Sequence, residues 1–146
     1  MMSATSQISE RYPTRHEGSI KPARILVVED QELLTTIIAD VLSDAHEVVC
    51  AAKVEDAVDR LLGDAIDLVL LDCVLPDGPN WQVALEADRQ NIPVVFMTGD
   101  PGQAKELVGG GRPYLIKPFG LAALIDLIDS TVRQKSMDAE ARSDAG

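Results

Sequence analysis

The sequence predicts an α/β domain in which five parallel strands form one doubly wound sheet with helices on both faces. Three observations support this prediction. Five short runs rich in Val, Ile and Leu recur along the chain, segments with helical spacing separate them, and most of the runs lack polar alternation. Runs of that kind are typical of strands covered on both faces, and regular alternation of strand and helix is typical of a parallel sheet.

The five apolar runs are three to five residues long, which is a usual length for strands. Turn-forming or helical segments separate each run from the next, so each predicts a separate strand. The runs are RILVV at 24–28, EVVCA at 47–51, DLVLL at 67–71, VVFM at 94–97 and YLI at 114–116.

Apolar residues recur at intervals of three and four between the predicted strands and after the last one, which predicts five amphipathic helices. The pattern is weaker at 81–85 and short at 104–108, where three glycines at 109–111 end the helix early because glycine loses much backbone entropy in a helix. The three clear helices contain Leu34, Ile37, Ile38, Val41 and Leu42; Val54, Ala57, Val58, Leu61 and Leu62; and Leu121, Leu124, Ile125, Ile128 and Val132.

Both ends of the chain are polar and lack periodicity, so residues 1–22 and 134–146 are expected to be flexible tails beside a single domain at 23–133. About a dozen residues follow the last predicted helix, too few for an output domain, so we expect a stand-alone domain. No apolar run approaches the ~20 residues that span a bilayer, and residues 1–22 lack the apolar stretch that is typical of a secretory signal. A cytoplasmic protein that does not contact membranes is therefore expected.

The charge of the chain also limits its function. The formal net charge is −11, and residues 23–133 carry nineteen acidic and eight basic side chains. This balance argues against a nucleic-acid partner, which needs clustered Lys and Arg. Cys50 and Cys73 form neither a CxxC motif nor a metal-binding pattern, so we expect two reduced, buried thiols.

Polar residues end four of the predicted strands: Glu29 and Asp30 the first, Asp72 the third, Thr98 the fourth and Lys117 the fifth. The carboxyl ends of parallel strands meet at one edge of the sheet. Carboxylates held close together there repel one another unless a cation such as Mg²⁺ binds them. An ammonium and a hydroxyl complement phosphoryl oxygens, and a carboxylate can attack phosphorus to form an acyl phosphate. Asp72 ends a central strand and is the candidate nucleophile.

Four motifs, ILVVED, LLDCVLPDG, FMTGD and YLIKPF, follow one another with a characteristic spacing. Through them, residues 24–132 resemble the receiver domain of two-component response regulators. The resemblance implies a flavodoxin-like sheet with strand order 2-1-3-4-5. It also implies a cis peptide bond between Lys117 and Pro118.

The resemblance implies roles for individual residues around a phosphorylation site. Asp72 would accept the phosphoryl group and would bind Mg²⁺ together with Asp30 and the backbone carbonyl of Val74. Glu29 would bind the ion through water, although an Asp is commoner at this position. The turn after Asp72 also departs from the family, since Asn80 stands where a glycine is frequent.

Three further residues match family positions. Thr98 would donate a hydrogen bond to a phosphoryl oxygen, and Lys117 would pair with the phosphoryl group. Tyr114 occupies the aromatic switch position, which rotates inward when Thr98 moves.

Together these roles imply a single-domain response regulator that receives its phosphoryl group from a histidine kinase or a histidine phosphotransfer protein. It would switch a partner-binding face made of the fourth helix, fifth strand and fifth helix, or act as a phosphate sink. It would catalyse its own phosphorylation and dephosphorylation without being a turnover enzyme. One alternative is an interaction module that works without phosphorylation. Another is a phosphohydrolase with an aspartyl nucleophile, which would need a general acid at the position of Val74.

Overall fold

The computed structural model describes residues 21–145, which form one sheet of five parallel strands in the order β2-β1-β3-β4-β5. The predicted fold class and strand order are confirmed. The predicted N-terminal tail lies outside the described residues except for its last two positions. The elements are β1 (Arg24–Val28), α2 (Glu32–Leu42), β2 (Glu47–Ala51), α3 (Val54–Gly63), β3 (Leu68–Asp72), α4 (Trp81–Arg89), β4 (Val94–Thr98), α5 (Pro101–Gly109), β5 (Tyr114–Ile116) and α6 (Leu121–Ala145).

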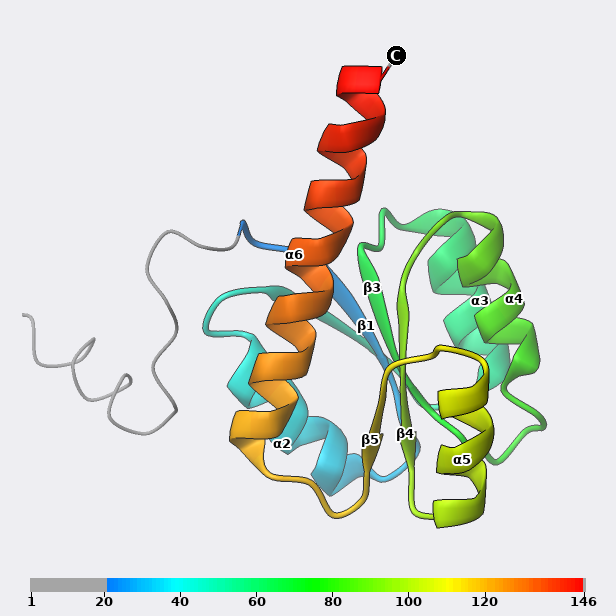
Figure 1. Cartoon of the computed structure of the whole chain (residues 1–146). Coiled ribbons are helices and arrows are strands. Elements are labelled where there is room, and N and C mark those ends of the chain that lie inside the picture. Colours follow the sequence, from blue (N-terminus) through cyan, green and yellow to red (C-terminus); the bar gives the residue numbers. More distant parts are fainter. Residues whose placement is uncertain (1–20, 146) are drawn as a thin grey trace, which may run out of the picture.

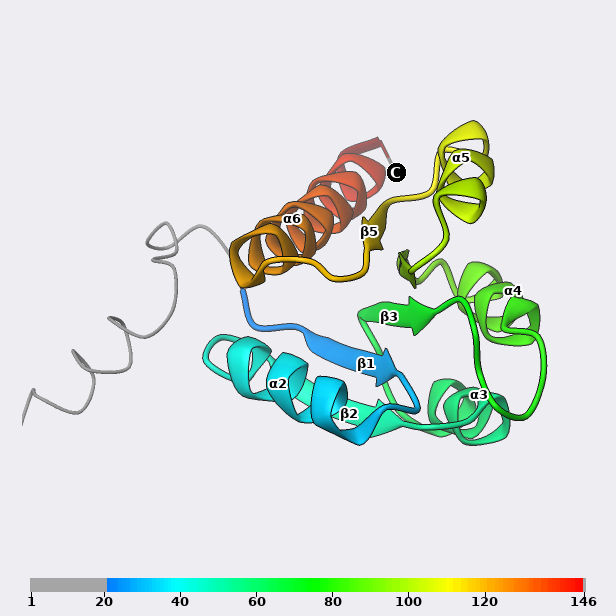
Figure 2. The same ribbon diagram turned by 90° about the horizontal axis from the view of Figure 1, so that it is seen from below.

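Helices cover both faces of the sheet, with α2 and α6 on one face and α3, α4 and α5 on the other (Figures 1 and 2). Successive side chains of a strand point to opposite faces, so each central strand contributes to two apolar cores. In β1, Leu26 and Val28 pack in the core beneath α3 and α4, whereas Ile25 and Val27 pack in the core beneath α2 and α6. Burial on both faces explains why the central strands lack polar alternation.

The positions at which the strands end are important because the predicted polar residues lie at the carboxyl ends of the strands. The bounds predicted for β1, β2 and β5 are confirmed. Strand β4 extends one residue further than predicted, to Thr98, and β3 is shifted by one residue, from 67–71 to Leu68–Asp72. Asp72 pairs in register with Met97 of β4, and the N–H of the next residue, Cys73, donates to the Met97 carbonyl at 2.9 Å. Asp72 is therefore held by the sheet itself rather than by a loop.

The last two helices differ in how well the sequence predicts them. Helix α5 ends at Gly109, as the glycine run predicts. Helix α6 continues to Ala145, so residues 134–145 are helical. That this segment is a flexible tail stays a prediction. Most of these residues are good helix formers, and Lys135 Nζ donates to the Asp67 carbonyl at 3.1 Å. The end of α6 projects beyond the sheet (Figure 1).

Both cysteines are free thiols, but the expectation that they are buried is wrong. Cys50 is exposed because β2 is an edge strand whose side chains are only partly covered, and Cys73 is half-buried beside Asp72. Partial loss of contact with water still raises the pKa of both thiols, and the charge of Asp72 adds to this rise at Cys73.

Sequence reasoning assigned no role to His46, which the structure buries between β1 and α6. Its Nδ1 accepts a hydrogen bond from the Ala23 N–H at 3.0 Å, and its Nε2 lies 3.3 Å from Asp129 Oδ1. The imidazole thus links the start of the sheet to α6. Within residues 21–145, no helix has the length and apolar character needed to cross a membrane.

Candidate functional site

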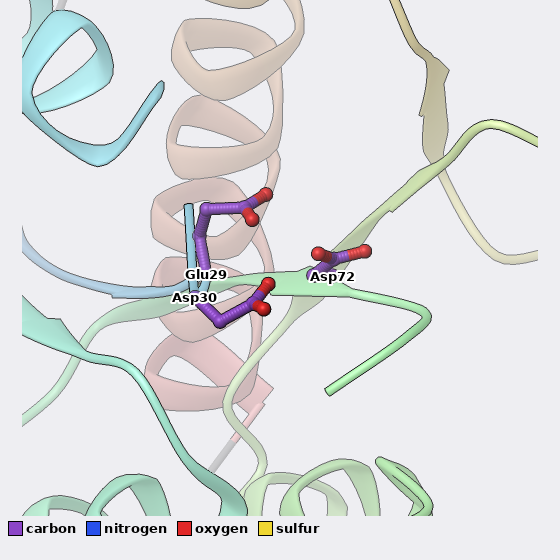
Figure 3. A group of neighbouring side chains, drawn as sticks. All are labelled: Glu29, Asp30 and Asp72. Carbon is purple, nitrogen blue, oxygen red and sulfur yellow. The ribbon is translucent and has the colours of Figure 1, made fainter. Parts of the chain in front are cut away.

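The carboxyl edge of the sheet brings three predicted carboxylates together. Glu29 and Asp30 directly follow β1, and Asp72 ends the neighbouring strand β3. Each of the three residues offers a carboxylate oxygen within 4.8 Å of the other two, and the side chains converge on one region (Figure 3). Glu29 and Asp72 are buried, whereas Asp30 is exposed. Such a cluster of oxygen donors open to solvent on one side suits a hard divalent cation.

Lys117, which follows β5, provides the positive charge of this site. Its Nζ lies 2.7 Å from Glu29 Oε1 and 3.1 Å from Asp72 Oδ2. Burial alone would lower the pKa of the Lys117 ammonium, but its hydrogen bonds to the two carboxylates and their charges raise that pKa above its ordinary value. The peptide bond between Lys117 and Pro118 is cis, which confirms the prediction.

The pKa of Glu29 shows that the ammonium of Lys117 does not fully compensate for the burial of this carboxylate and for the charge of Asp72. Burial raises the pKa of Glu29, and the charge of Asp72 raises it further. The hydrogen bonds from Lys117 and from the Gln31 N–H act in the opposite direction without offsetting burial. The pKa values of both groups are therefore raised for different reasons. Burial is the main cause at Glu29, whereas the hydrogen bonds and charges of two carboxylates outweigh burial at Lys117.

The loop after β3 fixes the orientation of the Asp72 carboxylate. The N–H of Val74 donates to Asp72 Oδ1 at 3.2 Å, while Lys117 holds Oδ2. The side chain of Val74 is 70% exposed, so this residue meets the site through its backbone. Asn80 Nδ2 donates to the Asp72 carbonyl at 3.1 Å. A departure from the family pattern thus supplies a hydrogen bond that a glycine has no side chain to make.

Asp77 connects the same loop to the start of α3. Its Oδ1 accepts from the Val54 N–H at 2.8 Å and its Oδ2 from the Glu55 N–H at 3.2 Å. These backbone hydrogen bonds lower the pKa of the Asp77 carboxyl. Gly78, with φ of +139°, makes the turn that follows in a conformation that favours glycine. Sequence reasoning missed Asp77, because the contact joins segments more than twenty residues apart.

Replacing Asp77 with alanine is expected to lower the melting temperature by a few degrees, because two N–H groups of α3 lose their cap. Asp77→Asn should give an intermediate value, since an amide has one acceptor oxygen where the carboxylate has two. Thermal unfolding followed by circular dichroism measures the effect. Asp59→Ala, an exposed acid on α3, serves as the control, and an Asp77→Ala melting temperature equal to that of this control would contradict the capping role.

Thr98 and Tyr114 lie on adjacent parallel strands, Thr98 at the end of β4 and Tyr114 at the start of β5. Thr98 is 1% exposed; its hydroxyl accepts from the Asp100 N–H at 3.0 Å and lies 2.7 Å from Gln103 Oε1. Tyr114 is half-buried, pairs in register with Phe96 and packs against the core beneath α3 and α4. The switch role of Tyr114 stays a prediction. No motif pointed to Gln103, because its contact with Thr98 depends on how α5 begins.

Four of the predicted site residues, Glu29, Asp30, Asp72 and Lys117, therefore meet in space, with Thr98 ending the strand beside Asp72. Comparison with known families gives this arrangement its context. The family model described as the response regulator receiver domain matches residues 25–129. This chain belongs to the response regulator receiver family.

Individual relatives of this receiver agree with the assignment. The transcriptional regulatory protein TcrA of Mycobacterium tuberculosis strain H37Rv is 30% identical over the whole of this chain, which matches 60% of TcrA. The chain thus spans less than two thirds of the length of this curated relative. The receiver domain of HemR from Leptospira biflexa, solved in its non-phosphorylated form, is 29% identical with a TM-score of 0.67, covering 77% of this chain and 94% of that one.

A more distant structure supports the fold alone. A CheY-like response regulator receiver domain protein from Methanospirillum hungatei is 20% identical with a TM-score of 0.72. The match covers 81% of this chain and 99% of that protein.

Proposed function

We propose that this receiver accepts a phosphoryl group on Asp72 from a phosphohistidine of a histidine kinase or a histidine phosphotransfer protein. The observation that supports this proposal most is the convergence of three carboxylates with one ammonium bonded to two of them. A phosphoryl group carries negative charge on its oxygens, so an acceptor carboxylate needs positive charge around it.

The residues present fit a Mg²⁺ ion. Three carboxylate oxygens lie within 4.8 Å of one another, and the ammonium of Lys117 bonds to two of the three residues, which leaves an excess of negative charge on hard oxygen donors. Asp30, Asp72 and the backbone carbonyl of Val74 would hold the ion directly, and Glu29 would hold it through water. When bound, the ion supplies positive charge that opposes the charge on the phosphoryl oxygens.

The chemistry at Asp72 is nucleophilic substitution at phosphorus. A carboxylate oxygen of Asp72 forms the new P–O bond while the P–N bond to the donor imidazole breaks, and the imidazole nitrogen retains the electron pair. The Val74 N–H and Lys117 orient the carboxylate, and Lys117 also pairs with phosphoryl oxygens as charge develops. Thr98 would donate its hydroxyl proton to one of these oxygens.

Hydrolysis of the acyl phosphate would return Asp72 to its free form. In this scheme the receiver catalyses its own phosphorylation and dephosphorylation and does not turn over a separate substrate.

The phosphorylated form is proposed to act through the face formed by α5, β5 and α6, either by binding a downstream protein or as part of a phosphate sink in the cytoplasm. Ile116 of β5 is 43% exposed on this face, and Tyr114 lies on the same strand. Nucleic-acid binding is not part of the proposal, because residues 23–133 carry nineteen acidic and eight basic side chains. The name of TcrA refers to transcription, but this chain matches only part of that protein.

Incubation with acetyl phosphate and Mg²⁺, followed by intact mass measurement, tests the proposal. The expected result is the gain of one phosphoryl group, removed by hydroxylamine as an acyl phosphate should be. Borohydride reduction converts the modified aspartate to homoserine, and peptide sequencing should then locate it at position 72. No gain in mass would favour an interaction module independent of phosphorylation, and sustained hydrolysis of small phosphate esters would favour a phosphohydrolase.

A further inference from the structure

The hydroxyl of Thr98 already has a partner in this structure. Its Oγ1 donates to Gln103 Oε1 at 2.7 Å and accepts from the Asp100 N–H at 3.0 Å. The Asp100 carbonyl, at 3.4 Å, is the more distant acceptor. A hydroxyl has a single proton to donate. While Gln103 receives that proton, Thr98 has none for a phosphoryl oxygen on Asp72.

We propose that Gln103 is a positioning residue that holds the Thr98 hydroxyl in its unphosphorylated orientation; this inference rests on the proposed phosphorylation of Asp72. Binding of a phosphoryl group then requires an exchange, in which the hydrogen bond to Gln103 breaks and a hydrogen bond to a phosphoryl oxygen forms. The difference in free energy between these two hydrogen bonds determines how readily the receiver adopts its phosphorylated form. Gln103 therefore opposes phosphoryl binding, whereas Lys117 favours it.

The position of Gln103 connects the site to the proposed output face. Gln103 is half-buried in the first turns of α5, and α5 is one of the three elements of that face. The turn that begins the helix is fixed by the Gly102 N–H, which donates to Asp100 Oδ1 at 2.8 Å. Because Thr98 ends β4 and Gln103 belongs to α5, releasing their hydrogen bond removes a direct link between the phosphorylation edge and this helix. Loss of that link provides a physical route by which chemistry at Asp72 changes α5.

Affinity for beryllofluoride, a tetrahedral mimic of the phosphoryl group, measures the exchange directly. Wild-type protein and variants are titrated with beryllofluoride by calorimetry at saturating Mg²⁺. Gln103→Leu, which removes the acceptor but keeps much of the side-chain volume, is expected to bind about fivefold more tightly, since a neutral hydrogen bond no longer has to break. Gln103→Glu retains an acceptor oxygen and should show no gain in affinity. Gln134→Leu on α6 makes the same change near the far end of the strands and should match the wild type.

The same substitution in a Thr98→Val variant shows whether the gain in beryllofluoride affinity depends on the Thr98 hydroxyl. In Thr98→Val, which lacks the hydroxyl, adding Gln103→Leu should leave the affinity unchanged. Equal or weaker binding by Gln103→Leu in the wild-type background would overturn the inference, and so would a gain that persists in Thr98→Val. If the wild-type protein itself fails to bind beryllofluoride with Mg²⁺, the proposed function fails, and the inference fails with it. A residue needed only for folding would not tighten binding when it is removed.

Discussion

Replacing Asp72 with asparagine is expected to abolish phosphoryl uptake and, without Mg²⁺, to make the folded protein more stable. The first effect follows because an amide oxygen is a poor nucleophile towards phosphorus. The second follows from the electrostatics of the site, where Asp72 is 5% exposed and lies beside two further acids. A functional site that holds like charges together loses stability in doing so, and removing one of them relieves the repulsion.

The sizes of the charge repulsions and of the charge attraction at Asp72 determine whether the substitution stabilises or destabilises the protein. At an effective dielectric constant of about 20, two unit charges 4.8 Å apart interact by about 3.5 kcal/mol, and two charges 3.1 Å apart by about 5 kcal/mol. The variant loses two repulsions, with Glu29 and Asp30, and one attraction, with Lys117. Two repulsions of at least the first size outweigh one attraction of the second. Solvent around the exposed Asp30 reduces the difference to about 1 kcal/mol, a rise in melting temperature of about 3–5 °C.

Thermal unfolding with and without Mg²⁺ measures this effect, and acetyl phosphate labelling measures the loss of phosphorylation. Mg²⁺ at ten times its dissociation constant should stabilise the wild type by about 1.4 kcal/mol and the variant much less, because a direct ligand is lost. Asp126→Asn, an exposed acid on α6, should behave as the wild type in both assays. A lower melting temperature for Asp72→Asn than for wild type in the absence of Mg²⁺ would show that Asp72 contributes more attraction than repulsion.

The sequence predicts the sheet well because each strand carries its own burial signal. Apolar runs without alternation locate the strands, and the order of motifs locates the polar edge. What periodicity does not show is where a helix that leaves the core will end. Residues 134–145 have no apolar stripe, so they read as a tail, yet their helical propensity extends α6 into solvent. Exposure of Cys50 was missed for a related reason, since a run of apolar residues does not reveal which strand lies at the sheet edge.

The residues of the candidate site also fall into two groups, those that the sequence predicts and those that it does not. Glu29, Asp72 and Lys117 were predictable because strand ends bring them to one edge, whatever the shape of the loops. Asp77 and Gln103 were not, because their contacts depend on how a loop folds back on α3 and on how α5 begins. Residues carried by strands were thus predictable from order in the chain, whereas residues carried by loops needed coordinates.

Replacing Lys117 with methionine is expected to have the opposite effect on stability from Asp72→Asn, although both changes impair phosphorylation. The substitution keeps much of the side-chain length but removes the ammonium that lies 2.7 Å from Glu29 and 3.1 Å from Asp72. Glu29, whose side chain is 0% exposed, then has no ammonium partner. Breaking a buried ion pair costs about 3–5 kcal/mol, and the 23% exposure of Lys117 together with protonation of Glu29 reduces this to about 2–3 kcal/mol.

The rate of labelling by acetyl phosphate at saturating Mg²⁺ should fall about 100-fold in Lys117→Met, because a preorganised charge facing the phosphoryl oxygens is lost. The melting temperature should fall by about 6–15 °C. Lys135→Met, which removes a lysine paired with Asp67 just before β3, is the matched control and should label at the wild-type rate. Labelling of Lys117→Met at the wild-type rate in folded protein would remove Lys117 from the proposed chemistry. A fall in rate caused by unfolding alone would disappear on cooling well below the melting temperature, whereas loss of charge stabilisation would persist there. The opposite stability changes in the two variants follow from one feature, a cluster of three carboxylates in which one ammonium bonds to two of them.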